Sequence, residues 1–329
     1  MSAAEAMAAL VLVGLCAYGV LAGADFGGGI LDALARGPRR DAQRDAIARA
    51  MGPVWEANHV WLIFVIVLLF TGFPRAFFTL GEALFVPFHL ALVGITLRGG
   101  AFVFRAYGPP ETTSLRRWGR VFGIASVFTP VLLGMCLGAV SSGRIRVGAD
   151  GELTAGSGAW HSPLALVTGL FALSLCAYLA AVFLTLETEG DLRDDFRRHA
   201  LAIGTVVVAL SAALVPWVFV AAPHLGAGLL SARALPVLAL GGAAALASGY
   251  GLYRRRFGLA RAAAVAQVTC LLGGWGLAQL PFLIYPDVTL AGSAAPDATL
   301  TATLWTIPPG LALLLPALWW LFRVFKSAR

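Results

Sequence analysis

Three ionisable side chains lie inside segments that are otherwise apolar enough for a membrane. Asp25 is the only charge in residues 10–31, Glu56 lies near the start of the next apolar segment, and Arg98 lies in the third. A charged side chain at the centre of a bilayer costs roughly 2.5–3.5 kcal/mol on insertion scales, so such residues usually face a protein interior or a proton or ion path. The three residues therefore indicate chemistry that is coupled to protons or ions.

The distances of these residues from the basic segment ends place them at compatible depths. Asp25 lies eleven residues before Arg36, Glu56 lies seven residues after Arg49, and Arg98 lies seven residues before the next arginine. At a rise of about 1.5 Å per residue, these separations are roughly 16, 10 and 10 Å. Because consecutive helices usually neighbour each other, we expect contact between the three groups. Burial favours the neutral form of a carboxylic acid and a nearby guanidinium favours the anion, so the group either relays protons or only locks the helices together.

The composition predicts an all-α polytopic membrane protein. The 329 residues are 59% hydrophobic and 12% charged, with a mean hydropathy of +0.82, whereas soluble domains carry about 25% charged residues. A membrane crossing needs about 20 apolar residues. About nine transmembrane helices are expected, near 7–34, 53–74, 83–104, 118–141, 161–186, 200–222, 234–253, 262–285 and 301–322.

The net charge of +7 reflects orientation in the membrane rather than nucleic-acid binding. Of the 24 Lys and Arg residues, 19 lie in the alternate connections 35–52, 105–120, 187–199 and 254–261 and after residue 322. Basic loops stay in the cytoplasm. The N-terminus is therefore expected outside and the C-terminus in the cytoplasm, which an odd number of crossings also requires.

Short connections predict a single membrane domain over residues 1–329. We expect a first four-helix group in 1–141 that holds the intramembrane charges, a second group in 161–285, and a last helix at 301–322. The polar segment 36–49 is compatible with a helix on the cytoplasmic surface. Segments 141–160 and 286–299 are expected as external loops because they contain glycine and proline and few basic residues.

Two other patterns are given structural interpretations. The triple glycine 27–29 lacks the lysine and strand context of a phosphate loop, so it is expected to allow close helix packing or a bend. His59 lies near the cytoplasmic end of its segment and His89 near the external end of the next, so no haem iron is expected to join them.

Three segments resemble subunit II of the cytochrome bd quinol oxidases. Residues 23–31, GADFGGGIL, resemble the first-helix sequence DGFDLGVGIL of that family. Residues 53–62, PVWEANHVWL, are similar to PVWDGNEVWL, and residues 97–105, LRGGAFVFR, are similar to LRGVAFEFR. The likeness extends over nearly the whole chain, and the second and third segments are its specific part.

The resemblance implies a haem-free subunit in a bacterial cytoplasmic (inner) membrane that pairs with subunit I. That partner carries b-type and d-type haems, oxidises quinol and reduces dioxygen to water; small single-helix subunits, lipid and quinone are further partners. Asp25 and Glu56 become proton-path candidates with Arg98 as their charge partner, and Trp61 becomes an oxygen-route candidate. Ala22 and Val103 replace family carboxylates, which puts the usual proton route in doubt.

Two other readings of the sequence stay open. A proton-coupled secondary transporter is suggested by Asp25 in a glycine-rich helix and by the echo of residues 15–18 (LCAY) at 175–178. Parallel internal repeats of this kind occur in transporters, although no pair of broken helices is evident in the two halves. A scaffold subunit whose charges are only structural is the third reading.

Overall fold

Eight helices in the described residues are long and apolar enough to cross a membrane, which confirms the all-helical membrane class. They are α1 (Ala3–Leu34), α5 (Phe85–Tyr107), α6 (Thr112–Ser141), α7 (Pro163–Glu187), α8 (Gly190–Ala221), α10 (Leu235–Tyr253), α11 (Phe257–Gln279) and α13 (Asp297–Ser327). The computed structural model describes residues 2–51, 55–107, 112–148 and 150–327; the side chains of residues 51, 55–57, 106–107, 112–113, 321–322 and 324–327 lie outside this description.

A bent helix pair is the ninth candidate for a crossing. Residues 58–72 of helix α3 (Trp55–Gly72) and helix α4 (Pro74–Ala83) are long and apolar enough when taken together, and they meet at an angle of 119°, as in a broken span or a re-entrant loop. Proline at the first position of a helix disfavours the α-helical conformation in the residue before it, and Phe73, with φ −137° and ψ 61°, is not helical. Neither the bend nor the separate helix α4 was part of the crossing predicted at 53–74.

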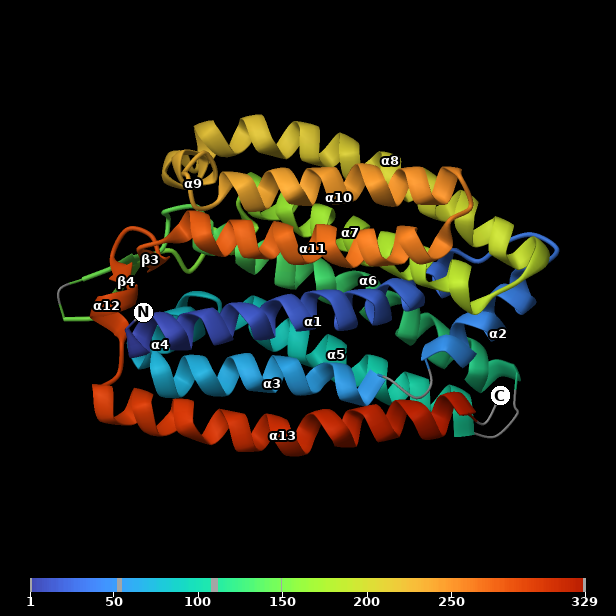
Figure 1. The fold of residues 1–329 in the computed structure, drawn as a ribbon, viewed down its shortest axis with the longest axis horizontal. Helices are drawn as coiled ribbons and strands as arrows, with labels where there is room; N and C mark the ends of the chain where they lie inside the picture. Colours follow the sequence, from blue (N-terminus) through green and yellow to red (C-terminus); the bar gives the residue numbers. More distant parts are fainter. Residues whose placement is uncertain (1, 52–54, 108–111, 149, 328–329) are drawn as a thin grey trace.

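The loops carry short elements that mark the two ends of the bundle (Figure 1). One end, called here the hairpin end, holds the antiparallel pairs β1–β2 and β3–β4. The other, called the α2 end, holds helix α2 and the last turns of α13. The short elements are α2 (Arg40–Met51), β1 (Arg146–Val147), β2 (Leu153–Ala155), a 3-10 helix (Ala159–His161), α9 (Pro223–Leu229), β3 (Phe282–Ile284), β4 (Val288–Thr289) and α12 (Leu290–Ser293).

Three predicted helix boundaries differ from the structure by six residues or more. Helix α6 begins at Thr112 rather than at 118, because its polar first turns lie outside the apolar stretch. Helix α11 ends at Gln279, six residues before the predicted end at 285, because Pro281 cannot continue a helix and residues 282–284 pair with β4 instead. Helix α8 begins at Gly190 rather than at 200. Its first turns are polar, so hydropathy did not include them in the span, although they continue the same helix.

Helix α1 lies in the middle of the bundle, between α11 and α3 (Figure 1), and contacts α7, α3, α6 and α11. Glycine makes this central position possible. A Cβ on Gly27 would lie 1.9 Å from the backbone oxygen of Cys176 in α7, and a Cβ on Gly29 would lie 2.0 Å from Ser126 Oγ in α6. The triple glycine therefore serves close helix packing, as predicted.

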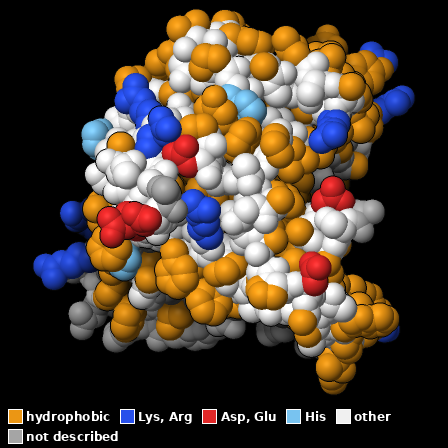
Figure 2. Space-filling model, turned by 90° about the vertical axis from the view of Figure 1, so that its left-hand side faces the viewer, with side chains coloured by type: hydrophobic (Ala, Val, Ile, Leu, Met, Phe, Trp, Pro, Cys, Tyr) orange, Lys and Arg blue, Asp and Glu red, His pale blue; other side chains and the backbone are white. Residues whose placement is uncertain are grey.

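The charges are distributed unequally between the two ends. The basic connections 35–52, 187–199 and 254–256 and the C-terminal turns of α13 gather at the α2 end. Figure 2 looks onto the hairpin end, where charged side chains of both signs are set among uncharged ones. There Arg146 Nε lies 2.7 Å from Asp287 Oδ2 and ties one hairpin to the other. Which end faces the cytoplasm stays a prediction.

Candidate functional site

Asp25 on α1 and Arg98 on α5 form a buried ion pair. Arg98 Nη1 donates to Asp25 Oδ2 at 2.7 Å, and Nη2 donates to the backbone oxygen of Asp25 at 2.9 Å. Arg98 Nε donates a third hydrogen bond, to Ser126 Oγ on α6 at 3.0 Å. The two charged side chains are 3% and 2% exposed. The expected contact between these two residues is thus present, and it joins three helices.

Aromatic rings enclose the guanidinium of this pair. The Cζ atom of Arg98 lies 5.0 Å from the ring centroids of both Phe26 and Phe122. A cation over an aromatic face is attracted by the ring's quadrupole, and the attraction is larger where water is excluded. The rings therefore stabilise Arg98 and also keep water from weakening its pair with Asp25.

A second ion pair repeats the first one two helical turns towards the α2 end. Asp32 follows Asp25 by seven residues on α1, and Arg105 follows Arg98 by seven residues on α5. Arg105 donates to both carboxylate oxygens of Asp32, at 3.0 and 3.1 Å. Residues seven apart lie on one face of a helix, so the parallel helices α1 and α5 bring both pairs into register.

The second pair extends to the surface helix α2. Arg44 Nε donates to the backbone oxygen of Asp32 at 3.2 Å and lies 3.8 Å from its carboxylate. Phe122 packs against both ion pairs, because the Cζ of Arg105 also lies 5.0 Å from its ring centroid. Hydropathy did not reveal Asp32, which lies at the boundary of its apolar segment, and Arg105 was predicted only as an orientation signal and as part of the motif at 97–105. The matching seven-residue spacing on both segments could have revealed the pair.

Glu56 belongs to the first turn of α3, but its side chain lies outside the described residues. The predicted meeting of Glu56 with Asp25 and Arg98 therefore stays a prediction. The next turn of α3 does reach the neighbourhood: the His59 ring centroid lies 6.4 Å from that of Phe26 and 6.3 Å from that of Tyr18. Helix α3 thus borders the same aromatic shell as the ion pair.

Trp61 is half-buried against a small apolar cluster on α1. The buried members of this cluster are Tyr18, Ala22 and Phe26, and Trp61 packs on them from α3. Its indole also meets Phe64 edge-on at 6.0 Å between centroids. Ala22, which stands where the family has a carboxylate, is 1% exposed inside this cluster. The surroundings of Trp61 are therefore apolar, while the ion pair begins one turn further along α1.

These features define a polytopic helical membrane protein with charged residues paired in its interior. The chain belongs to the family described as cytochrome bd terminal oxidase subunit II, whose model matches residues 3–325. The likeness found in the sequence is thereby confirmed, and the chain is a subunit of a bd-type terminal oxidase. Nothing in the comparisons supports the transporter alternative.

Individual relatives agree with this assignment. A putative cytochrome bd menaquinol oxidase subunit II of Bacillus subtilis (strain 168) is 26% identical over 324 residues, which cover 94% of this chain and 91% of that protein. The cytochrome bd-I ubiquinol oxidase subunit 2 of Escherichia coli (strain K12) is 26% identical over 213 residues, 64% of this chain and 55% of that protein. A chain in the structure of bd oxidase from Geobacillus thermodenitrificans shares the fold over the whole of both chains, with a TM-score of 0.84 and 23% identity.

Proposed function

We propose that this chain is the haem-free subunit II of a bd-type quinol:O2 oxidoreductase in a bacterial cytoplasmic membrane. It pairs with a subunit I that holds the b-type and d-type haems, with small single-helix subunits and lipid as further neighbours. The observation that carries this proposal is the match of the subunit II family model to residues 3–325. The gathering of basic connections at the α2 end supports a cytoplasmic position for that end.

The buried charges are proposed to serve proton delivery. Reduction of dioxygen to water consumes protons, which must cross low-dielectric protein to reach the reaction site. Asp25 and Glu56 are the carboxylates proposed to carry them, and Arg98 sets the charge balance of Asp25 through the 2.7 Å contact. A proton that binds Asp25 would remove its negative charge and weaken its attraction to Arg98. Proton binding and the strength of the ion pair are therefore coupled.

Trp61 is proposed to border the route of oxygen. Dioxygen is apolar and partitions into the membrane, so its path should be lined by apolar groups. The cluster of Tyr18, Ala22 and Phe26 beside Trp61 has this character. A Trp61→Ala variant should change the apparent KM for oxygen more than kcat at saturating oxygen if the indole borders that route.

The assembly proposal is tested by isolating the native complex gently from membranes. A reduced-minus-oxidised spectrum should show d-type haem, and this chain should co-purify with the haem-bearing subunit. Deleting the gene for this chain should abolish that absorbance. If d-type haem absorbance and quinol oxidase turnover persist without the chain, the proposed function is wrong.

A further inference from the structure

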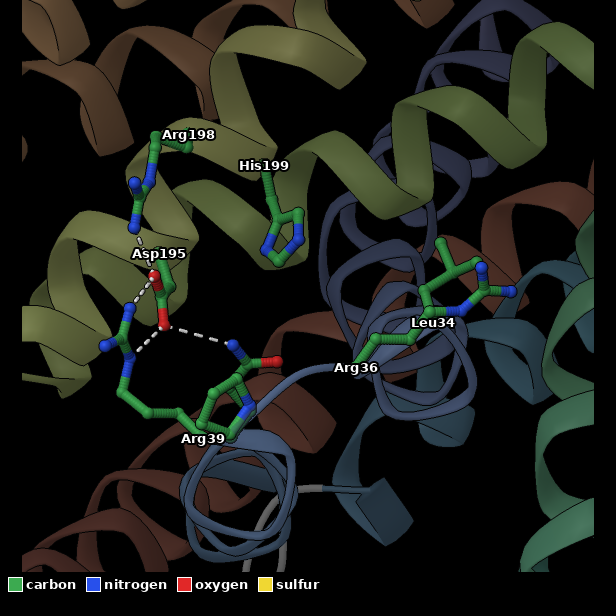
Figure 3. Close-up of a pocket in the computed structure, with 8 residues that line it drawn as sticks. Leu34, Arg36, Arg39, Asp195, Arg198 and His199 are labelled. Atoms are coloured by element: carbon green, nitrogen blue, oxygen red, sulfur yellow. Dashed lines mark hydrogen bonds and ion pairs between the residues drawn. The ribbon is translucent and has the colours of Figure 1, made fainter.

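An open pocket of about 340 Å³ lies at the α2 end, where α1 ends and α2 and α8 begin (Figure 3). Three arginines line it, Arg36, Arg39 and Arg198, together with Asp195 and His199. None of these residues belongs to the ion pairs of Asp25 and Asp32. The pocket is therefore a separate feature of the molecule that proton delivery does not explain.

The charges in this pocket do not cancel. Arg39 holds Asp195 through Nε and Nη2, both at 2.7 Å, and Gln43 adds a hydrogen bond at 3.1 Å. Arg198 bonds the same carboxylate. Among the described residues Arg36 has no acidic partner, and in Figure 3 its side chain extends away from Asp195. Two guanidiniums therefore hold the one carboxylate of the pocket, and the third, on Arg36, leaves the lining with excess positive charge.

The exposed carboxylate of Asp191 nearby does not remove this excess positive charge. Asp191 lies 3.6 Å from Arg39 Nη1, but its side chain is 82% exposed, so solvent screens its charge. Arg39 and Arg198 are 43% and 66% exposed, so both keep N–H groups that face the pocket or solvent. The pocket offers these donors with a remaining positive charge.

The imidazole of His199 also lines the pocket. Its ring projects into the space between Asp195 and Leu34 (Figure 3). Within the described part of the chain, its buried Nδ1 has no hydrogen-bond partner. Guanidinium groups bind phosphate oxygens through paired, charge-assisted hydrogen bonds. The chemistry of the pocket thus fits a phosphate group.

An apolar surface leads away from the pocket into the span. Leu34 at its rim is 50% exposed. Along α8, one to three turns beyond Arg198, the same face continues with exposed side chains: Ala202, Thr205, Val206 and Ala209. A positively charged pocket at the end of a span, followed by an exposed apolar stripe, matches a phospholipid better than a free anion.

We propose that this pocket binds the phosphate of an anionic phospholipid headgroup, with an acyl chain lying along the exposed face of α8. Arg36 and Arg198 supply the attraction, while Arg39 and Asp195 hold the pocket in shape. Zwitterionic lipid carries the same phosphate together with a cation, so it should bind more weakly in a pocket with excess positive charge. The proposal does not depend on the route taken by protons or quinol.

The test uses the intact oxidase complex and native mass spectrometry with three probes: phosphatidylglycerol, phosphatidylcholine and inorganic phosphate. Each basic residue near an anionic lipid contributes about fivefold to affinity, so the double variant Arg36→Gln, Arg198→Gln should bind phosphatidylglycerol about 25-fold more weakly. Arg255→Gln is the matched control, because Arg255 is 60% exposed and also pairs with a residue of α8, Asp194, outside the pocket. This control should bind lipid as the parent does.

Assembly is checked by the haem spectrum of each variant. If the double variant does not assemble, the single variant Arg36→Gln, which breaks no ion pair of the described residues, should still show about a fivefold loss. Equal binding of phosphatidylglycerol by parent and pocket variants would overturn the proposal. So would equal binding of phosphatidylcholine, or displacement of the lipid by inorganic phosphate at the same concentration.

Discussion

The Asp25 carboxylate and the Arg98 guanidinium meet at 2.7 Å although 73 residues separate them in the sequence. Arg98 also binds the backbone oxygen of Asp25, so its position is fixed relative to the helix as well as to the charge. Two buried charges of opposite sign neutralise each other, and each becomes costly when the other is removed. This dependence makes the pair testable.

Arg98→Ala should prevent stable assembly of the complex. Removing one partner of a buried ion pair costs about 3–5 kcal/mol, because the remaining charge is left unpaired away from water. Yield of the complex after gentle solubilisation, measured by d-type haem absorbance, reports this loss.

The double variant Asp25→Leu, Arg98→Leu separates structure from proton delivery. Replacing a whole buried pair by apolar residues is often neutral for stability, so the double variant should assemble better than Arg98→Ala. Its quinol oxidase turnover should stay low if Asp25 carries protons. Turnover at the parent level in the assembled double variant would restrict the pair to a structural role.

Glu56→Gln should lower quinol oxidase turnover substantially while the complex assembles normally. The amide keeps the size of the side chain but cannot accept and release a proton at physiological pH. Turnover measured across pH in the purified complex is the readout. The control is Glu82→Gln at an exposed position of α4, and equal turnover of both variants across the pH range would favour the scaffold reading.

Asp32→Asn should loosen the attachment of α2 to α1 and α5. Hydrogen bonds to a charged group contribute about 1.5–3 kcal/mol each when one partner is removed, and Asp32 is only 4% exposed on its side chain. We expect a loss of about 2 kcal/mol in the free energy of unfolding by detergent titration. Asp194→Asn, which breaks an ion pair that is 38% and 60% exposed, should cost less than about 1 kcal/mol. Equal losses in the two variants would show that burial of Asp32 does not strengthen its pair.

The link between the two hairpins should depend on pH. Hydrogen bonding from Arg146, the largest cause, holds the pKa of Asp287 below its usual range, and the Val147 amide adds to this. The folded pKa is thus below the unfolded value of about 3.9, so the stabilisation is present above that value and disappears as pH falls through the folded pKa.

The difference in Tm between the parent and Asp287→Asn should therefore be constant near neutral pH and shrink below about pH 4. Asp150→Asn, at an exposed turn position between β1 and β2, is the control and should show no such pH-dependent difference. A parent-minus-variant difference that grows at low pH would contradict the assignment of Asp287.

Local sequence properties predicted the membrane architecture well. Crossing a bilayer depends on the summed transfer free energy of one continuous segment, so hydropathy located α1, α5, α7 and α10 within a few residues. It failed where local geometry overrides hydropathy. The bend at Phe73 and the end of α11 at Gln279 both depend on a following proline, and the polar first turns of α8 extend a helix beyond its apolar part.

The sequence by itself determined the all-helical membrane class, the approximate number of candidate spans and the kinship with subunit II, because these depend on residue type along one chain. Helix rise even predicted that Asp25 and Arg98 reach similar depths. Only the tertiary structure decided which helix faces meet: the pairing of Asp32 with Arg105, the donor from Ser126 and the contact of Arg39 with Asp195. Such contacts join residues far apart in sequence, and they depend on the rotation and close approach of neighbouring helices, which hydropathy does not encode.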